Sequence, residues 1–373
     1  MRVVLVSLCL LGLAWGDDSD KEKKPAAPQR PVAPKRKPRK PHMSALQWLA
    51  AHQDDDGRWD CDGFAKHDPA GDQCDGAGGS EFDIAMTGLA LLAFLRSGYT
   101  DAGSPEQNPF AGTVRRGLAW LIAQQDRDGI MRGGEWGMWI YGHVMAANAL
   151  CEAFALTGED RYREPAQLAL EYIDSARNPD GGWRYAPYAK LSDTSVTTWC
   201  VLAFDAARRG GLQVEDESIQ GAHKWVESMT DRKTWRVGYT KRGEPMVSEA
   251  VDATAVRTST AGGILIRVLT GEPKWSKPVK EGAKRVVEAL PVWNRTNGPI
   301  DLYYWFFATT ALKKAGGAPW SKWSRKLRPT LEKNLHQPGT GARAGSLDPV
   351  GHWGAYGGRI MTTAFCALCL AQL

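Results

Sequence analysis

Apolar residues recur at helical spacing along most of the chain, in segments of two alternating kinds. Segments such as 83–94 and 193–204 are apolar around most of their circumference, which is typical of helices buried on two sides. Segments such as 113–125 and 164–177 carry Arg, Gln and Glu along one face. We therefore predict helical hairpins, each with a solvated outer helix followed by an apolar inner helix.

Six segments are expected as inner helices: 83–94, 143–154, 193–204, 258–269, 301–312 and 359–370. Glycines follow several of them at the position of a left-handed C-cap, as Gly158 and Gly271 do. The last segment is apolar almost to the C-terminus, whereas an open solenoid needs polar caps at both ends. The pattern predicts an all-α fold without strands, an α/α toroid of about six helix hairpins closed in a ring.

A motif recurs where the outer segments end, combining an aromatic–aliphatic pair, a Gln and a Gly-rich turn with Trp. Its copies occupy 44–59, 116–129 and 168–183. We interpret Gln53, Trp59, Gln125 and Trp183 as structural residues. The Gln amide is expected to bond free backbone groups of a neighbouring helix, and the Trp to cover the turn.

This motif resembles the QW repeat of the prenyltransferase and squalene-cyclase superfamily. The resemblance covers nearly all of 43–373, and its most specific stretches are 178–185, 193–197 and 303–305. The chain is similar to secreted proteins known only by their prenyltransferase and squalene-oxidase repeats. The resemblance implies the toroid fold, while activity has to be argued from the site.

The catalytic motif of squalene-type cyclases is degenerate here. These enzymes protonate an alkene with the middle Asp of a D-x-D-D-T signature. In the matching stretch Lys190 replaces the first Asp and Ser192 the proton donor, so only Asp193 and Thr194 agree. A serine hydroxyl cannot protonate an alkene, and cyclase activity of this kind is not expected.

The zinc site of prenyltransferase β subunits is also incomplete, and a thioester is excluded. Asp301 stands at the position of the ligating Asp, but Tyr303 replaces the Cys and His352 matches the distant His only loosely. The thioester of related complement domains needs Gly-Cys-[Gly/Glu]-Glu-Gln, which no Cys of this chain has. We predict no metal and no cofactor.

The N-terminal region differs in composition from the rest of the chain. Residues 1–16 have the apolar run and small-residue end of a signal peptide, which predicts a secreted, periplasmic or envelope protein. Residues 17–42 form a Lys/Pro-rich linker that should be disordered and could contact an envelope or protein partner. This linker holds nine basic and four acidic residues, which accounts for the net charge of +5, so no nucleic-acid partner is expected.

Two cysteines and many acidic residues lie between the first outer and the first inner segment. Cys61 and Cys74 could form a disulfide in an oxidising compartment, whereas the other cysteines read as small core residues. The Asp-rich stretch 54–75 lacks the ligand spacing of a known calcium loop. We interpret it as a solvated turn, with calcium binding as the alternative.

Candidate ligand-binding residues cluster at the starts of the inner segments. Asp83, His143, Asp193 and Asp301 occupy aligned positions that would surround one mouth of the ring. The alternative is that each Asp caps a helix N-terminus. If they are only caps, their carboxyl groups would take no part in binding or catalysis.

Aromatic residues are also concentrated near these starts, and Trp139, Tyr303, Tyr304 and Trp305 are expected to contact a ligand. Further aromatic residues of the same turns and helices are Trp136, Tyr141, Trp183, Tyr185, Tyr188 and Trp199. An aromatic cavity suits an apolar, isoprenoid-like ligand or a sugar face. The alternative is a toroid centre filled by these rings.

The sequence thus leads to three hypotheses of function. The first is a toroid outside the cytoplasm that binds an apolar or glycan ligand without catalysis by the known sites. The second is an enzyme that processes terpenoids or cleaves polysaccharides with Asp193 or Asp301. The third is a scaffold that binds protein partners on its outer helices.

Overall fold

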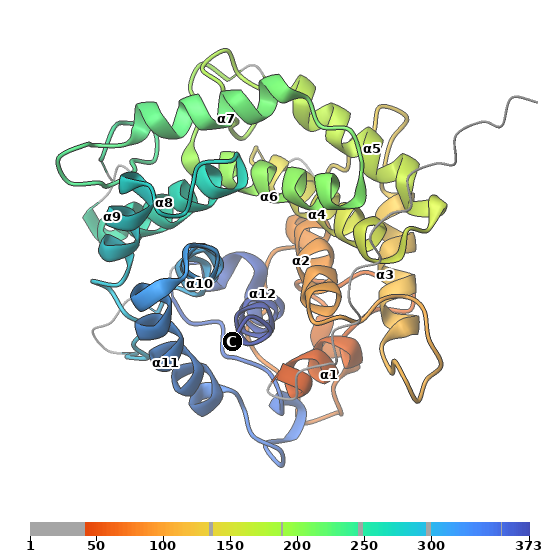
Figure 1. The fold of residues 1–373 in the computed structure, drawn as a ribbon. Helices are drawn as coiled ribbons and strands as arrows, with labels where there is room; N and C mark the ends of the chain where they lie inside the picture. The colour runs from red at the N-terminus through yellow and green to blue at the C-terminus, as the bar shows by residue number, and fades with distance from the viewer. Residues whose placement is uncertain (1–41, 134–136, 188, 245–248, 296–299, 352) are drawn as a thin grey trace, which may run out of the picture. The chain divides into compact units, whose positions relative to one another are not determined.

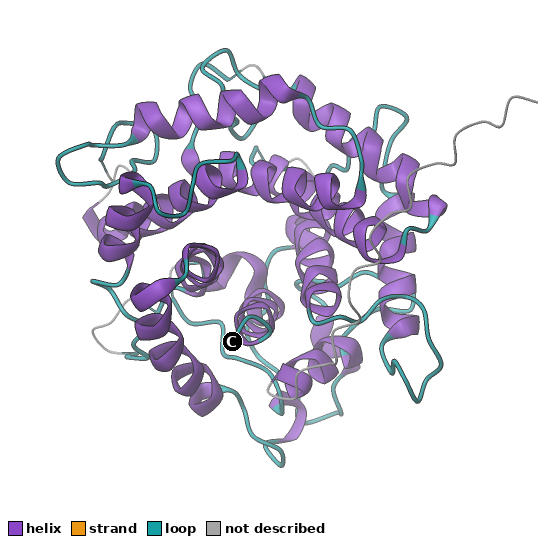
Figure 2. Cartoon of the chain, viewed as in Figure 1, coloured by secondary structure: helices purple, strands orange, loops and turns teal. Residues whose placement is uncertain are grey.

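The computed structural model describes residues 42–373 except 134–136, 188, 245–248, 296–299 and 352. The predicted signal peptide and almost all of the predicted linker lie outside the described residues, and both stay predictions. Within the described part, twelve α-helices and no strand are found. Figures 1 and 2 show helices joined by loops, without a strand among the described residues. The predicted all-α fold is confirmed.

Six helices form the inner layer, and they are the ones expected from the apolar segments. Their bounds are α2 (Asp83–Arg96), α4 (Ile140–Thr157), α6 (Thr194–Gly210), α8 (Glu249–Leu269), α10 (Leu302–Ala315) and α12 (Gly354–Leu370). Each packs against the next, and α12 packs against α2. The inner layer of residues 42–373 is therefore a closed ring.

Six amphipathic helices lie outside this ring, each joined to the inner helix that follows it. They are α1 (Met43–Ala51), α3 (Ala111–Ala123), α5 (Asp160–Ser175), α7 (Asp216–Met229), α9 (Lys277–Val286) and α11 (Gly317–Asn334). Figure 1 shows α7 outside α6 and α8, and these helices are in contact. Three short 3-10 helices complete the elements: η2 (Phe64–His67), η3 (Ser80–Phe82) and η4 (Gly341–Arg343).

The glutamines of the repeated motif join consecutive outer helices. The Gln53 amide after α1 donates to the carbonyl of Thr113 in α3, at 2.9 Å, and to Gly57 in its own turn. The Gln125 amide after α3 repeats this with Pro165 in α5, also at 2.9 Å. The acceptors are carbonyl oxygens within the neighbouring helix, so the structural role expected for these glutamines is confirmed.

The tryptophans of the motif fasten each turn to its own hairpin. The buried Trp59 indole donates to the Leu49 carbonyl at 2.7 Å, and the Trp59 backbone N–H donates to the Thr87 hydroxyl in α2 at 3.0 Å. Trp183 repeats both contacts with Ile173 and Thr197. Each turn thereby satisfies its buried polar groups while its indole fills the space between the two layers.

Gly57 occupies a backbone conformation that a residue with a side chain would strain. Its φ is +103°, and an added Cβ would lie 2.3 Å from the carbonyl oxygen of Arg116 in α3. We predict that Gly57→Ala lowers the free energy of unfolding by about 2–4 kcal/mol, because backbone strain and a clash add. Urea unfolding followed by circular dichroism measures this loss.

The matched control is Gly71→Ala. Gly71 also has a positive φ, +85°, but nothing lies within 4 Å of its added Cβ. Only the strain of about 1–2 kcal/mol is expected there. Equal losses in the two variants would contradict the claim that the turn after α1 contacts α3 too closely for a side chain.

The ring closes where α12 and the segment between α11 and α12 meet α1 and the segment 60–79, which we name the closure loop. The Trp48 indole of α1 donates to the Ala342 carbonyl at 3.0 Å, and an added Cβ on Gly345 would lie 2.3 Å from the Ser44 carbonyl. The Arg359 guanidinium of α12 reaches the Asp75 carbonyl of the closure loop at 2.9 Å. The first and last repeats are therefore joined by polar contacts as well as by apolar packing.

No helix among the described residues is long and apolar enough to cross a membrane.

The glycines expected as C-caps do adopt left-handed conformations, with φ of +69° at Gly158 and +103° at Gly271. This conformation ends the inner helices and lets the chain turn back to the outer layer.

Candidate functional site

A cavity of about 210 Å³ opens at the end of the ring where most inner helices begin. All six inner helices contribute to its walls. Its aromatic and methionine lining consists of Phe82, Met86, Met138, Tyr141, Met145, Tyr185, Tyr239, Tyr303, Trp353, Tyr356 and Met361. Polar groups among the lining residues are few, and they come from tyrosine, serine and threonine hydroxyls and from Asp301.

Hydroxyl groups of the cavity wall form a connected network. The Tyr141 hydroxyl donates to Ser195 Oγ at 3.0 Å, and Ser195 Oγ lies 2.6 Å from the Tyr303 hydroxyl. The Trp199 indole donates to the same Tyr303 hydroxyl at 2.9 Å. Burial raises the pKa of Tyr303 well above its ordinary value, so the phenol stays neutral and can both donate and accept hydrogen bonds.

Asp193 lies behind this wall and is completely buried. It caps α6, since its Oδ1 accepts the Val196 N–H at 2.8 Å, whereas Oδ2 has no hydrogen-bond partner among the described residues. Burial raises the pKa of Asp193 to about 7, and the Val196 N–H, Arg184 and the Tyr239 hydroxyl oppose the rise. The carboxyl group therefore exchanges a proton near neutral pH, which is the property of a general acid or base.

Asp301 brings a second carboxyl group to the cavity, and this one lines it directly. Its Oδ1 accepts the Tyr304 N–H at 2.9 Å, so it caps α10 as Asp193 caps α6. After burial, the charges of Asp193 and Asp301 are among the causes that raise the pKa of Tyr303. Both carboxyl groups therefore lie near enough to Tyr303 for their charges to affect its pKa. Each Asp caps a helix with one carboxylate oxygen, and this does not prevent the same carboxyl group from transferring a proton.

Asp83 belongs to a different cluster and does not line the cavity. Its Oδ1 accepts the Cys61 N–H at 2.9 Å, and its Oδ2 accepts a bond from Arg58 at 3.3 Å. Burial raises the pKa of Asp83 to about 6. The expected mouth position is therefore wrong for Asp83, because Arg58 and the turn after α1 draw the side chain toward the outer layer.

His143 is a structural residue between the two layers. It is fully buried, its Nδ1 accepts the Met131 N–H at 3.2 Å, and its Nε2 lies 3.1 Å from the Ala169 carbonyl. Desolvation lowers the pKa of His143 to about 4, so the ring is neutral. His143 accepts a backbone N–H of the preceding turn, as the Thr87 hydroxyl does in the first repeat. The expectation that His143 lies at the mouth of the ring is therefore wrong.

The other predicted aromatic residues also point away from the cavity. The Tyr304 hydroxyl donates to the Val286 carbonyl at 2.7 Å, and Trp305 packs against Trp293 with ring centroids 6.2 Å apart. Trp139 packs against Tyr172. Of the four aromatic ligand residues expected from the sequence, only Tyr303 lines the cavity.

Sequence reasoning missed a large part of the lining. Tyr141 and Tyr185 were among the expected aromatic residues, but Phe82, Tyr239, Trp353 and the methionines were not. The missed aromatic residues stand singly in or beside the turns that lead into inner helices, a weak signal that alignment of the repeats could have revealed. Trp136, Tyr188 and His352 lie outside the described residues.

The Asp-rich stretch 54–75 is not the expected solvated turn, and it contains no disulfide. Asp54 and Asp60 are buried and both bind the Lys66 ammonium group, at 2.6 and 2.8 Å. Cys61 and Cys74 are separate, buried thiols, so the structure does not form the expected disulfide. The two cysteines have different neighbours, Asp83 for Cys61 and Asp68 for Cys74, which hold them in separate environments.

Comparison with known proteins gives solved structures only, since no family model and no curated protein matches the chain. An inactive variant of a GH76 α-1,6-mannanase from Salegentibacter sp. HEL1_6, in complex with α-1,6-mannotriose, has a TM-score of 0.59 at 12% identity, covering 89% of this chain and 98% of that one. An unsaturated glucuronyl hydrolase specific for heparin has a TM-score of 0.60 at 14% identity, covering 89% and 95%. Cellobiose 2-epimerase from Bacillus thermoamylovorans B4167 has a TM-score of 0.59 at 12% identity, covering 87% and 95%.

These similarities establish the fold and correct the expected family. The described chain is an α/α toroid, similar over nearly nine-tenths of its length to enzymes that act on glycans. The resemblance to the prenyltransferase and squalene-cyclase superfamily is therefore wrong. The Gln–Gly–Trp motif on which it rested describes how consecutive hairpins are joined, which is a property of the fold and not of an activity.

Proposed function

We propose that the protein binds a glycan at the toroid cavity and cleaves a glycosidic bond by acid–base chemistry. The observation that carries the proposal is the pair of carboxyl groups at one aromatic cavity. Asp301 lines its wall, and Asp193, with a pKa raised to about 7, lies directly behind it. Glycosidases work with such a pair, in which one carboxyl group is protonated while the other is ionised.

The shape and lining of the cavity support a sugar as the ligand. Aromatic faces pack against the C–H face of a pyranose, while phenol and serine hydroxyls bond its hydroxyl groups. The volume of about 210 Å³ is below the roughly 300–1,000 Å³ of pockets for drug-sized ligands. The cavity should therefore take one sugar unit of a chain, and the remaining units would extend into solvent.

The two carboxyl groups would have different roles. Asp301 faces the sugar and acts on it directly. Asp193 does not line the cavity, so its proton would have to pass through a hydroxyl of the wall, and we assign this role to the Tyr239 hydroxyl, which lines the cavity and bonds the Tyr185 hydroxyl there. The fold similarity to a mannanase variant in complex with α-1,6-mannotriose and to a glucuronyl hydrolase specific for heparin supports this class of ligand.

Asp301→Asn tests the proposal most directly. We predict that it lowers kcat by about 10²–10⁴-fold with little change in KM, because a carboxyl group that transfers a proton is lost while the sugar contacts remain. Asparagine caps a helix as well as aspartate does, so the fold should be kept. The assay is mass spectrometry of products from α-1,6-mannotriose, cellobiose and unsaturated heparin disaccharides.

Tyr304→Phe is the matched control. Tyr304 follows Asp301 on α10, but its hydroxyl bonds the Val286 carbonyl away from the cavity. This variant should keep full activity and lose only about 1 kcal/mol of stability. An active Asp301→Asn enzyme, or a wild-type protein that neither binds nor cleaves any oligosaccharide of the panel, would refute the proposal.

Export remains part of the proposal. A glycan substrate outside the cytoplasm agrees with the signal-like residues 1–16 and with the basic linker 17–42 as a contact to the envelope. N-terminal sequencing of the mature protein from a cell fraction tests the cleavage expected after Gly16.

A further inference from the structure

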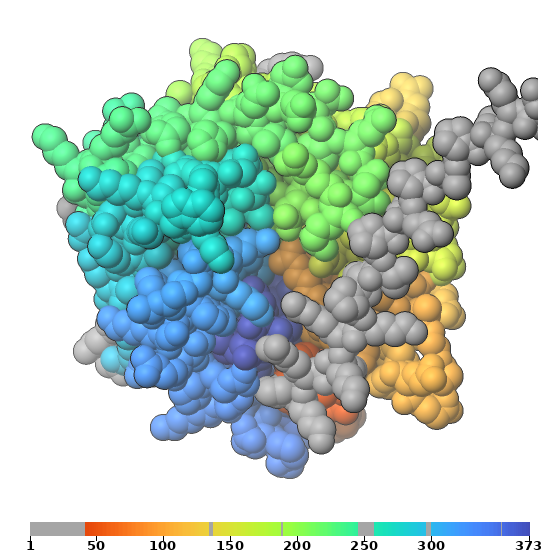
Figure 3. All heavy atoms as spheres, in the orientation of Figure 1, coloured from red at the N-terminus to blue at the C-terminus, as the bar shows by residue number. Residues whose placement is uncertain are grey.

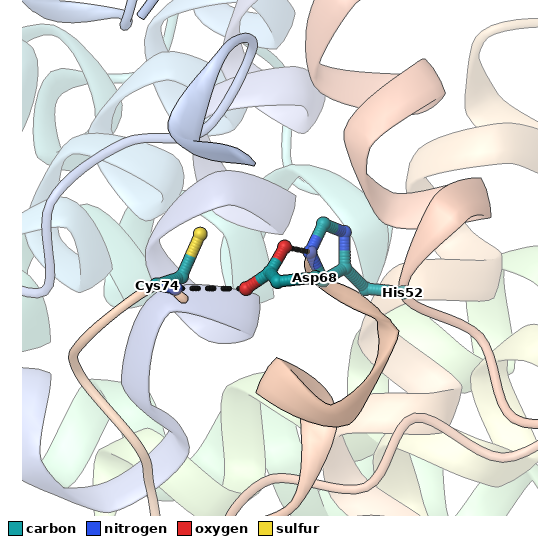
Figure 4. Close-up of side chains that lie close together, drawn as sticks. All are labelled: His52, Asp68 and Cys74. Carbon is teal, nitrogen blue, oxygen red and sulfur yellow. Dashed lines mark hydrogen bonds and ion pairs between the residues drawn. The ribbon is translucent and has the colours of Figure 1, made fainter. Parts of the chain in front are cut away.

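Three potential metal ligands meet beside α1, at a distance from the cavity. His52 follows the last residue of α1, Asp68 follows η2, and Cys74 lies in the closure loop. Figure 4 shows Asp68 between the His52 ring and Cys74. One ring nitrogen of His52, a carboxylate oxygen of Asp68 and Cys74 Sγ all lie within 4.8 Å of one another, and none of the three residues lines the cavity.

The His52 ring has two acceptors facing its two nitrogen atoms. Nδ1 is 2.7 Å from the Trp48 carbonyl, which can only accept, so Nδ1 carries a hydrogen atom. In the neutral ring Nε2 then holds a lone pair, and this lone pair faces Asp68 Oδ1 at 2.8 Å. Nε2 and Asp68 Oδ1 are therefore two lone-pair atoms that face each other, as two ligand atoms of one metal ion do.

The surroundings favour the metal ion. A histidine that binds a metal through Nε2 almost always donates its Nδ1 hydrogen to a carbonyl or carboxylate, as His52 does. Asp68 is oriented in the same manner, because its Oδ2 accepts the Cys74 N–H at 2.8 Å and leaves Oδ1 facing His52. The Cys74 thiol lies beside this pair and offers the third ligand atom.

The arrangement does not suit a nucleophilic cysteine. In such a site the histidine lies between the thiol and the carboxylate, and it uses one nitrogen for each. Here the carboxylate meets Nε2, and Nδ1 is bonded to the Trp48 carbonyl. His52 therefore has no nitrogen left that could accept the proton of Cys74.

We propose that His52 Nε2, Asp68 Oδ1 and Cys74 Sγ bind a divalent metal ion that accepts nitrogen and sulfur ligands, Zn²⁺ in the first place. Tetrahedral zinc with bonds of about 2.0–2.3 Å separates its ligand atoms by about 3.3–3.8 Å, so shifts of roughly 1 Å in side chains would complete the site. Ca²⁺ and Mg²⁺ prefer oxygen ligands. Metal binding releases the thiol proton to solvent, and a water molecule takes the fourth position.

The expected consequence is a fixed closure loop. The loop carries Asp75 and Gly76, whose carbonyls accept bonds from the Arg359 side chain and from its N–H in α12. A metal ion that joins Cys74 to His52 at the end of α1 would hold this contact between the first and the last hairpin. Zinc should therefore stabilise the ring without being required by the cavity.

The test uses the full chain, purified in the presence of a chelator and then titrated with Zn²⁺ or Co²⁺ alone. We expect one ion per chain by mass spectrometry under native conditions, and a sulfur-to-cobalt charge-transfer absorption with Co²⁺. Saturating Zn²⁺ should raise Tm by several degrees, because an ion that binds only the folded state shifts the unfolding equilibrium. A wild-type protein that binds neither ion would overturn the proposal.

Variants identify the ligands. Cys74→Ser should abolish the charge-transfer absorption and weaken Zn²⁺ binding at least about 100-fold, and His52→Gln should weaken it similarly. Cys61→Ala is the control, because Cys61 is a buried thiol of the same loop outside the cluster and its loss should leave the absorption unchanged. Unchanged Zn²⁺ affinity in both Cys74→Ser and His52→Gln would show binding elsewhere and refute the site.

Discussion

Replacement of Arg359 by methionine should lower the free energy of unfolding by about 3–5 kcal/mol, the cost of removing one partner from a buried ion pair. Only 1% of the Arg359 side chain is exposed. Its guanidinium bonds the Asp75 carbonyl at 2.9 Å, Ser346 Oγ at 2.9 Å and Asp348 Oδ1 at 3.0 Å. Methionine fills much of the volume but satisfies none of these groups, and urea unfolding measures the loss.

Arg295→Met is the control for this prediction. Arg295 also pairs with Asp348, but 60% of its side chain is exposed. An exposed pair contributes at most about 1 kcal/mol. If both variants lost the same stability, Arg359 would be an ordinary ion-pair partner, and the joining of α12 to the closure loop would have to come from apolar packing alone.

The helical layers could be predicted because their signals are local. The apolar segments 193–204 and 301–312 lie within α6 and α10 apart from the first residue of each, since burial on both sides leaves a continuous apolar pattern. Gln53 and Trp59 were interpreted correctly for the same reason, because their partners lie in the same or the next hairpin. Closure of the ring could be predicted because the final helix is apolar and needs a second packing surface, which α2 supplies.

The site could be predicted only in part, because an aligned position fixes a height along the ring but not a side-chain direction. Asp301 caps α10 and lines the cavity, whereas Asp193 caps α6 behind the cavity wall. His143 was aligned with them one helical turn out of register: it takes the position of Thr87 and Thr197, and its ring points between the layers, where a backbone N–H and a carbonyl need partners. Tyr304 is turned outward by its place on α10, one residue after Tyr303.

The contacts in and around the closure loop could not be predicted from the sequence, because they depend on how this irregular segment folds and not on a periodic pattern. His52, Asp68 and Cys74 are separated by 16 and 6 positions, which matches no metal-binding spacing. The charged groups Asp54, Asp60 and Lys66 looked solvated, but they neutralise one another in a buried cluster. The resemblance to the prenyltransferase and squalene-cyclase superfamily was wrong because its motif describes how consecutive hairpins are joined, and this contact does not depend on the activity.

Asp193→Asn should stabilise the toroid at high pH, the opposite of what the loss of a buried polar contact usually does. The pKa of Asp193 is raised from 3.8 to about 7, and its Oδ2 has no partner among the described residues. Asparagine keeps the cap on the Val196 N–H and carries no charge. The variant should therefore avoid the cost of burying an ionised carboxylate.

The sign follows from the protons bound in the two states. Below pH 3.8 Asp193 is protonated in both states, and its contribution to stability is fully present. Between pH 3.8 and about 7 only the unfolded state releases the proton, so stability falls as pH rises. The loss is complete above about pH 7, and a shift of roughly three units corresponds to about 4 kcal/mol.

The measurement is urea unfolding of wild type and variant at pH 4 and pH 8. The stability of Asp193→Asn relative to wild type should be about 3–4 kcal/mol more favourable at pH 8 than at pH 4. Asp128→Asn, which removes an exposed carboxylate, should differ from wild type by less than about 0.5 kcal/mol at either pH. A parallel pH dependence of wild type and Asp193→Asn would show that Asp193 ionises without cost and would remove it as the acid of the site.

The same variant separates stability from function. A fully buried carboxyl group with an unbonded oxygen lowers stability at neutral pH, and proteins retain such groups where chemistry requires them. Asp193→Asn should therefore be more stable and less active than wild type at pH 8, whereas a group that only caps α6 would leave activity unchanged. Stability and turnover measured on one preparation decide between these roles, because asparagine preserves the cap in both cases.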